Sequence, residues 1–215
     1  MNKLNVVGRR SFLRHASSTA LTLPLIGLGI LELTSCAGAT SGTALAPSDN
    51  NSPGSWKTSI CSEKEPGEPL IVSGTIYAPD GKTPMEGINL FVYQTDATGV
   101  YTTSGGDNRQ TRLHGSMRSN SEGKYEFRTI KPGSYPGSTN PAHIHAYVSG
   151  PGYPEYWIDE YHFEDDRFIS AEAKRKATEL GSFSPILKLT RDSDGILRGV
   201  RDIKLSHKEA QKAQK

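Results

Sequence analysis

The segment LIVSGTIYA, at residues 70–78, sets the pattern from which the fold follows. It is rich in Val, Ile and Tyr, which favour strands, and it ends at a Pro-Asp-Gly turn. INLFVYQTD (88–96) and KYEFRTI (124–130) repeat the pattern beside turns that contain Gly, Asp or Asn. The pattern continues in HIHAYVSG, FSPILKLT and VRDIKL, at residues 143–150, 183–190 and 200–205. Short strands at this spacing predict a β-sandwich of about 150 residues.

One helical segment interrupts the strands. SAEAKRKATEL (170–180) consists of strong helix formers, with Ser170 as an N-cap and Gly181 as a stop. We therefore predict an all-β fold, an Ig-like or transthyretin-like β-sandwich with loop insertions and one short helix. The predicted organisation along the chain is an export signal (1–35), a flexible tether (36–56), the sandwich domain (57–207) and a frayed tail (208–215).

The composition of the 215-residue chain excludes several classes of function. Its 25 Lys and Arg against 23 Asp and Glu leave a net charge of +2, which predicts no nucleic-acid partner. The only two cysteines, Cys36 and Cys61, exclude a disulfide-dense scaffold and a four-thiolate zinc or iron–sulfur site. The sequence after residue 35 has no P-loop, dinucleotide-binding glycine motif or GxSxG motif, so nucleotide and serine-hydrolase chemistry have no support. Any metal must use other ligands.

The first 35 residues have the features of an export signal. GRRSFLR (8–14) is basic, and the apolar run at 20–31 is too short to span a membrane in the mature protein. The paired arginines resemble a twin-arginine signal, which exports folded proteins, and LTSC (33–36) resembles a lipobox. We therefore expect acylation of Cys36 to anchor an exported protein to a membrane surface, in the periplasm or cell envelope. The alternative is a simple secretory signal that is cleaved nearby.

The sequence PAHIH (141–145) carries the most informative chemical signal. Alternate residues of a strand point to the same side, so the imidazoles of His143 and His145 can reach one metal ion. Outward-facing histidines are also ordinary on a half-exposed strand. Tyr101 and Tyr135 stand beside Gly and Pro turns that can aim their phenols inward, and two tyrosinates with two imidazoles favour ferric iron. The alternative is that these tyrosines are core or surface residues at strand ends.

Five longer segments follow one another in order over residues 70–205. They are VSGTIYAPDGKTPMEGINLFVYQTDATGVY (72–101), SNSEGKYEFRTIKPGSYPG (119–137), NPAHIHAYVSGPG (140–152), FEDD (163–166) and RDIKL (201–205). Together they resemble the intradiol ring-cleavage dioxygenases, in particular the protocatechuate-type catalytic domain. The resemblance implies one non-haem Fe(III) per domain, bound by Tyr101, Tyr135, His143 and His145.

The family resemblance also implies a reaction. A catechol would bind to the iron as a dianion, and O2 would attack the activated ring, which opens to a cis,cis-muconate that contains both oxygen atoms. Tyr135, as a departing ligand, would act as a catalytic base for one catechol proton. The implied role is the catabolism of aromatic compounds, with a small catechol and O2 as substrates and without NADH, flavin or a second metal.

The chain departs from the family pattern near the implied ring site. Asn140 stands where the family carries an arginine. We therefore predict that the uncharged amide of Asn140 takes the catalytic and substrate-binding role of that arginine. Glu160 stands where relatives often have Gln, and Gly137 replaces a bulky aromatic residue; we predict that both shape the substrate pocket. These changes favour a neutral or amine-bearing catechol over protocatechuate. His162 aligns with a family tyrosine near the metal, where it could orient neighbouring groups; the alternative is a packing or surface histidine. The arginines that could supply the missing charge are Arg109, Arg112, Arg118 and Arg128.

Two other functions fit the same residues. A binding module could keep the sandwich and the metal but lack ring cleavage, because Asn140 replaces the arginine. A zinc hydrolase could use His143 and His145 with a carboxylate such as Asp159. The sequence also leaves a homo-oligomer open. It does not predict the dimer of catechol-type family members, because we find none of the N-terminal helical segment through which they dimerise.

Overall fold

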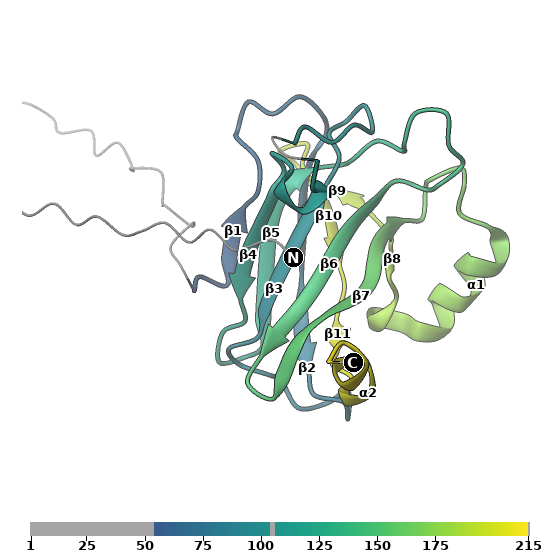
Figure 1. The fold of residues 1–215 in the computed structure, drawn as a ribbon. Coiled ribbons are helices and arrows are strands. Elements are labelled where there is room, and N and C mark those ends of the chain that lie inside the picture. Colours follow the sequence, from purple (N-terminus) through teal and green to yellow (C-terminus); the bar gives the residue numbers. More distant parts are fainter. Residues whose placement is uncertain (1–53, 104–105, 215) are drawn as a thin grey trace, which may run out of the picture. The chain divides into compact units, whose positions relative to one another are not determined.

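A computed structural model describes residues 54–103 and 106–214 (Figure 1). The predicted export signal (1–35), the predicted lipidation site Cys36 and the tether as far as residue 53 lie outside the described residues. The first strand of the predicted sandwich domain is β1 (Lys57–Ser59).

The strands form the two sheets of a β-sandwich, which confirms the predicted fold class. In the first sheet they lie in the order β1, β5, β2, β10, β9, and β11 also pairs with β2. Strand β2 is antiparallel to β5 and parallel to β10 and β11. The bounds are β1 Lys57–Ser59, β2 Pro69–Tyr77, β5 Lys124–Ile130, β9 Thr190–Arg191, β10 Leu197–Val200 and β11 Ile203–Lys204.

The second sheet has the strand order β4, β3, β6, β7, β8. Its bounds are β4 His114–Arg118, β3 Asn89–Gln94, β6 His143–Gly150, β7 Tyr153–Phe163 and β8 Ile186–Leu187. Figure 1 shows β3, β6 and β7 side by side, and β6 is antiparallel to both neighbours. The register sets Tyr93 of β3 opposite His145, and His162 of β7 opposite His143.

Alternation along β6 separates the core from the outer side of this sheet. Ile144 and Ala146 are completely buried in the core, whereas His143 and His145 point the opposite way. A fully buried side chain such as Ile144 contributes about 1.5–3 kcal/mol to folding. The core cluster joins these strands to side chains of the first sheet, which include Leu70, Val72 and Phe127.

The predicted helix is present as α1 (Ala171–Leu180). The hydroxyl of Ser170 accepts a hydrogen bond from the backbone N–H of Ala173, and Gly181 ends the helix in a left-handed conformation, as expected for a cap and a stop. Short 3₁₀ helices cover Asn108–Gln110 and Gly181–Phe183. Within the described residues, every helix is too short or too polar to cross a membrane.

A second helix, α2 (His207–Lys212), stands where the sequence predicts the start of a frayed tail. Its N-cap is Ser206, whose hydroxyl accepts from the backbone N–H of Glu209. The sequence shows no apolar stripe here, but Ala210 is buried against the core. The ring of His207 also stacks on Tyr153, with centroids 4.9 Å apart. Residues 208–212 of the predicted frayed tail are therefore helical.

A buried hydrogen-bond chain ties the two sheets together. The Tyr125 hydroxyl of β5 donates to the backbone carbonyl of Arg201 at 2.7 Å and accepts from the Tyr161 hydroxyl of β7 at 3.1 Å. The guanidinium of Arg201 also stacks over the Tyr161 ring at 4.6 Å. Gly74 is required at this crossing because a β-carbon there would lie 1.7 Å from the same carbonyl oxygen.

We predict that Tyr125→Phe lowers the free energy of unfolding by about 1–3 kcal/mol, because it leaves buried polar partners unsatisfied. Urea unfolding followed by fluorescence measures the change. Tyr77→Phe is the matched control, since the Tyr77 ring packs against Phe183 but its hydroxyl makes no hydrogen bond to another described residue. Equal stability of the two variants would contradict the assigned role.

Candidate metal centre

Two imidazoles stand at the start of β6. His143 and His145 are buried, with 6% and 8% of their surface exposed. Nδ1 of His143 lies 2.8 Å from the carbonyl oxygen of Pro141. A carbonyl can only accept, so Nδ1 carries the proton and Nε2 keeps its lone pair. The Nε2 atoms of the two rings are 3.2 Å apart.

Two loops bring phenols to these nitrogens. Tyr101 follows β3 and Tyr135 follows β5, and their hydroxyl oxygens are 2.8 Å apart. The Tyr135 oxygen also lies 3.0 Å from Nε2 of His143 and 3.4 Å from Nε2 of His145. The structure therefore brings together the four residues that the sequence singles out as metal ligands.

The spacing and chemistry of these four atoms fit one metal ion. An ion about 2.1 Å from its ligands places neighbouring ligand atoms about 3 Å apart. Burial, followed by the hydrogen bond with Tyr135, raises the pKa of the Tyr101 phenol. Without a cation, Tyr101 is therefore neutral, and a bound metal must displace its proton. Paired phenolate oxygens are hard donors that suit a ferric ion.

The two tyrosine loops touch backbone to backbone. Asp96 holds the loop of Tyr101, because its carboxylate accepts hydrogen bonds from the backbone N–H groups of Thr98 and Val100. The backbone carbonyl of Asp96 also accepts from the backbone N–H of Gly133, in the loop of Tyr135, at 2.9 Å. Gly99 has a φ of +82°, and a β-carbon there would lie 1.9 Å from the Ser134 carbonyl oxygen, next to Tyr135. This close approach fixes the distance between the two phenols.

Asp166 links the Tyr135 loop to the histidine strand. Its Oδ2 accepts from the backbone N–H of Ala142 at 2.8 Å and from the Ser134 hydroxyl at 3.3 Å. These partners precede His143 and Tyr135 in the chain. The sequence pattern by itself indicates no role for Asp166. The FEDD segment was the available signal, but a clamp between distant loops is visible only in three dimensions.

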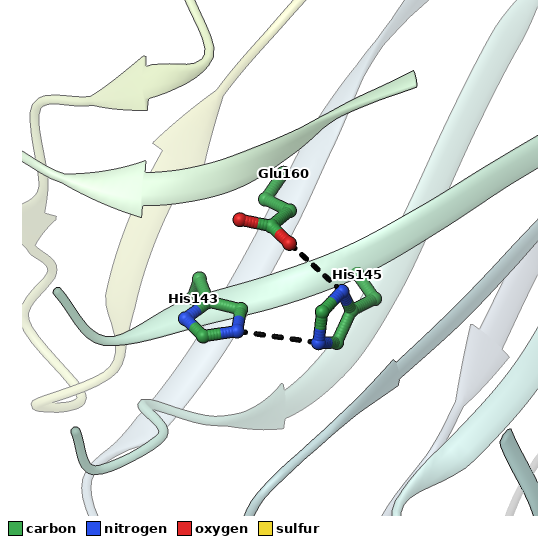
Figure 2. Close-up of side chains that lie close together, drawn as sticks. All are labelled: His143, His145 and Glu160. Carbon is green, nitrogen blue, oxygen red and sulfur yellow. Dashed lines mark hydrogen bonds and ion pairs between the residues drawn. The ribbon is translucent and has the colours of Figure 1, made fainter. Parts of the chain in front are cut away.

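Glu160 of β7 faces the imidazoles from the other side (Figure 2). Its Oε1 lies 3.0 Å from Nδ1 of His145, and its Oε2 lies 3.6 Å from Nε2 of His162. The contact with His145 is the main cause that lowers the pKa of the Glu160 carboxyl. Desolvation lowers the pKa of His162, so that ring is neutral near pH 7. Both residues thus lie beside the candidate metal ligands.

Aromatic rings hold His145 from both sides. Tyr93 stacks on its ring, with centroids 4.5 Å apart, and Trp157 approaches edge-on at 5.2 Å. Trp157 is 48% exposed, so this wall of the site also reaches the surface. The packing leaves the His145 ring little freedom to rotate away from its neighbours.

The two loop residues that were predicted to contact substrate lie on the Tyr135 loop. Asn140 is exposed, and its backbone N–H donates to the Ser138 hydroxyl. Gly137 has a φ of +72°, and a β-carbon there would meet nothing within 4 Å. Glycine at 137 is therefore required by the backbone conformation, and the space beside it is open.

The four arginines that could compensate for Asn140 are engaged elsewhere. Arg109 pairs with Glu155 at 3.0 Å and stacks over Tyr147, and Arg112 pairs with Glu65. Arg118 donates to the Gly87 carbonyl, and Arg128 lies on β5 of the other sheet.

Asp159, the carboxylate named for the zinc-hydrolase alternative, is not brought to the histidines, whereas its neighbour Glu160 is. Among the described residues, the histidine and carboxylate group that could hold a metal comprises His143, His145 and Glu160. Asp159 instead lines a cavity of about 320 Å³ with Arg201.

Residues 45–185 match the protein-family model described as "Dioxygenase". The match includes both phenols, both imidazoles and Glu160, and it begins within the segment predicted to be a tether. The chain belongs to the intradiol dioxygenase family.

Relatives in this family act on catechols and hydroxyquinols. Catechol 1,2-dioxygenase 2 of Acinetobacter lwoffii is 31% identical over 105 residues, which cover 41% of this chain and 38% of the relative. 6-Chlorohydroxyquinol 1,2-dioxygenase of Cupriavidus pinatubonensis is 27% identical over 123 residues, covering 50% and 44%. The chain thus spans between a third and a half of the length of these relatives.

A solved structure shows the same fold. The dioxygenase domain of a carbohydrate-binding fusion protein from Streptomyces sp. SirexAA-E superposes with a TM-score of 0.53 at 24% identity, covering 78% of this chain and 96% of that one.

We predict that Gly99→Ala weakens metal binding by about tenfold or more, because the new methyl group pushes the Tyr135 loop away from Tyr101. Metal titration followed by absorbance measures the loss. Gly152→Ala is the control: Gly152 also has a positive φ, +79°, but a β-carbon there meets nothing within 4 Å. If Gly99→Ala bound metal as tightly as Gly152→Ala, the contact between the two loops would not be what positions the phenols.

Proposed function

We propose that this chain is a non-haem Fe(III) intradiol dioxygenase that cleaves the ring of a catechol with O2 to a cis,cis-muconate-type product. The observation that carries the proposal is the convergence of two phenol oxygens and two imidazole nitrogens within 2.8–3.4 Å contacts. Membership of the intradiol dioxygenase family supports the reaction class.

Ferric iron, when bound, supplies a Lewis acid that accepts a catechol dianion and withdraws electron density from its ring. The chain's own residues position the donors and manage protons. The Tyr135 oxygen lies within reach of the other three donors and, as a phenolate, accepts one catechol proton; solvent hydroxide accepts the second. Catechol and O2 together contain every atom of the product, so the reaction needs no external reductant.

We propose a neutral or amine-bearing catechol as the substrate. Glu160 places a carboxylate beside the donor set, whereas Arg109 and Arg112 are already paired with Glu155 and Glu65. A catechol with its own carboxylate would therefore meet the negative charge of Glu160, and neither Arg109 nor Arg112 is free to offset it. The open space at Gly137 leaves room for a ring substituent.

We predict that the iron-loaded protein is red to purple through tyrosinate-to-iron charge transfer, and that Tyr101→Phe and Tyr135→Phe each change the visible spectrum. Tyr93→Phe is the control, because this phenol packs on His145 without joining the donor set. Absorption spectroscopy and iron analysis measure the result. A colourless, iron-free protein after loading would rule out the site.

Oxygen uptake tests the reaction itself. The panel is an unsubstituted catechol, an amine-bearing catechol and protocatechuate, and we expect uptake with the first two and a muconate-type product. Binding that shifts the spectrum without uptake would favour the catechol-binding module. Fast uptake with protocatechuate alone would overturn the proposed substrate class.

We also propose that the protein is exported and anchored through a lipid on Cys36, on the strength of its leader sequence. Metabolic labelling with palmitate should mark the wild-type chain and be abolished by Cys36→Ala. Cys61→Ala is the matched control, since Cys61 is a partly buried thiol within the domain. Unchanged labelling of Cys36→Ala would contradict the anchor.

A further inference from the structure

The two imidazoles of the site differ in the group that faces their Nδ1 atoms. His143 turns its Nδ1 toward a neutral group, the Pro141 carbonyl, at 2.8 Å. His145 turns its Nδ1 toward a charged group, the Glu160 carboxylate, at 3.0 Å. Figure 2 shows the carboxylate and the neighbouring imidazole at opposite nitrogens of the His145 ring.

This arrangement distinguishes a supporting carboxylate from a third ligand. The possible ligand atoms of Glu160, His143 and His145 all lie within 4.8 Å of one another, which by itself would allow a metal held by two histidines and a carboxylate. The phenol of Tyr135, however, lies 3.4 Å from Nε2 of His145, and Nε2 of His143 lies 3.2 Å from the same atom. Glu160 approaches Nδ1 instead, on the far side of the ring from the other donors.

The Nδ1 atom of His145 has a strong reason to carry the proton. It is buried and makes no well-aligned hydrogen bond within the described residues. The Glu160 carboxylate, which faces it at 3.0 Å, is therefore the group that compensates for the loss of hydrogen bonds to water. An ionised carboxylate can only accept, and this selects the ring form with a proton on Nδ1 and a lone pair on Nε2. The second carboxylate oxygen faces Nε2 of His162 at 3.6 Å.

We propose that Glu160 is a positioning residue that fixes the Nδ1-protonated form of His145 and makes His145 the more strongly donating of the two imidazoles. A carboxylate polarises the imidazole more than a carbonyl does, so Nε2 of His145 gains electron density. A ferric ion bound there is a weaker electron acceptor than it would be beside a neutral residue. The inference rests on the proposed function for the identity of the metal, but not for the protonation of the ring.

The protonation of His145 is tested in the metal-free protein by nitrogen NMR of the histidine rings. We expect Nδ1–H and an unprotonated Nε2 in the wild type, and a mixture of the two neutral forms in Glu160→Ala. Glu164→Gln is the control, because Glu164 is an exposed carboxylate one residue beyond the end of β7. A proton on Nε2 in the wild type, or the same spectrum in Glu160→Ala, would overturn the proposal.

The electronic effect is tested in the iron-loaded protein with Glu160→Gln, which keeps an oxygen acceptor but removes the charge. We expect the tyrosinate-to-iron band to move to longer wavelength and the reduction potential to rise, with no such shift in Glu164→Gln. Glu160→Ala should also weaken iron binding by about 10–100-fold. An unshifted spectrum and reduction potential in Glu160→Gln would overturn the electronic role of Glu160. The colour of the iron-loaded wild type would still support the proposed function in that case. If the wild type took up no iron, the NMR result would still decide the role of Glu160.

Discussion

The two-residue period of β6 is the constraint on which the site depends. His143 and His145 reach the donor cluster because Ile144 and Ala146 between them fill the core. A slip of one residue in the pairing of β6 would turn the imidazoles into the core and the apolar side chains toward the outer side of the sheet. Packing of the core therefore enforces the direction of the metal-binding side chains, and no separate interaction has to select it.

Strand alternation supplies only half of the donors, and the other half comes from loops that need support. Tyr101 and Tyr135 lie outside regular strands, where the backbone is freer and costs more entropy to fix. Three features stabilise the loops against this loss of entropy: the local turn around Asp96, the close contact at Gly99, and the hydrogen bonds of Asp166. The loops are thus held against each other as well as against the sheet, and this sets the position of the phenols.

The sequence predicted what local patterns encode. The strands β5 and β6 have their predicted bounds, and α1 begins and ends at its predicted cap and stop. Strand β7 was missed because Pro154, Glu155 and several other charged residues mask any apolar alternation, and its burial pattern is irregular. The helix α2 was missed because tertiary contacts hold it, including the burial of Ala210 and the stacking of His207 on Tyr153. Glu160 faces His145 because β7 pairs with β6, and the sequence alone does not specify this pairing.

The two phenols and two imidazoles of the donor cluster form a stable arrangement in the metal-free, protonated state. A hydrogen-bond chain joins Tyr101 to Tyr135 and Tyr135 to His143, so these partly buried phenols and the buried imidazole satisfy one another in their neutral forms. Two phenolates at 2.8 Å would repel each other strongly without a cation. Metal binding must therefore exchange phenol protons for a metal ion at oxygens that are already in position. This separates the folding of the sandwich from the loading of the metal, in contrast to small zinc domains, in which the metal supplies the folding energy.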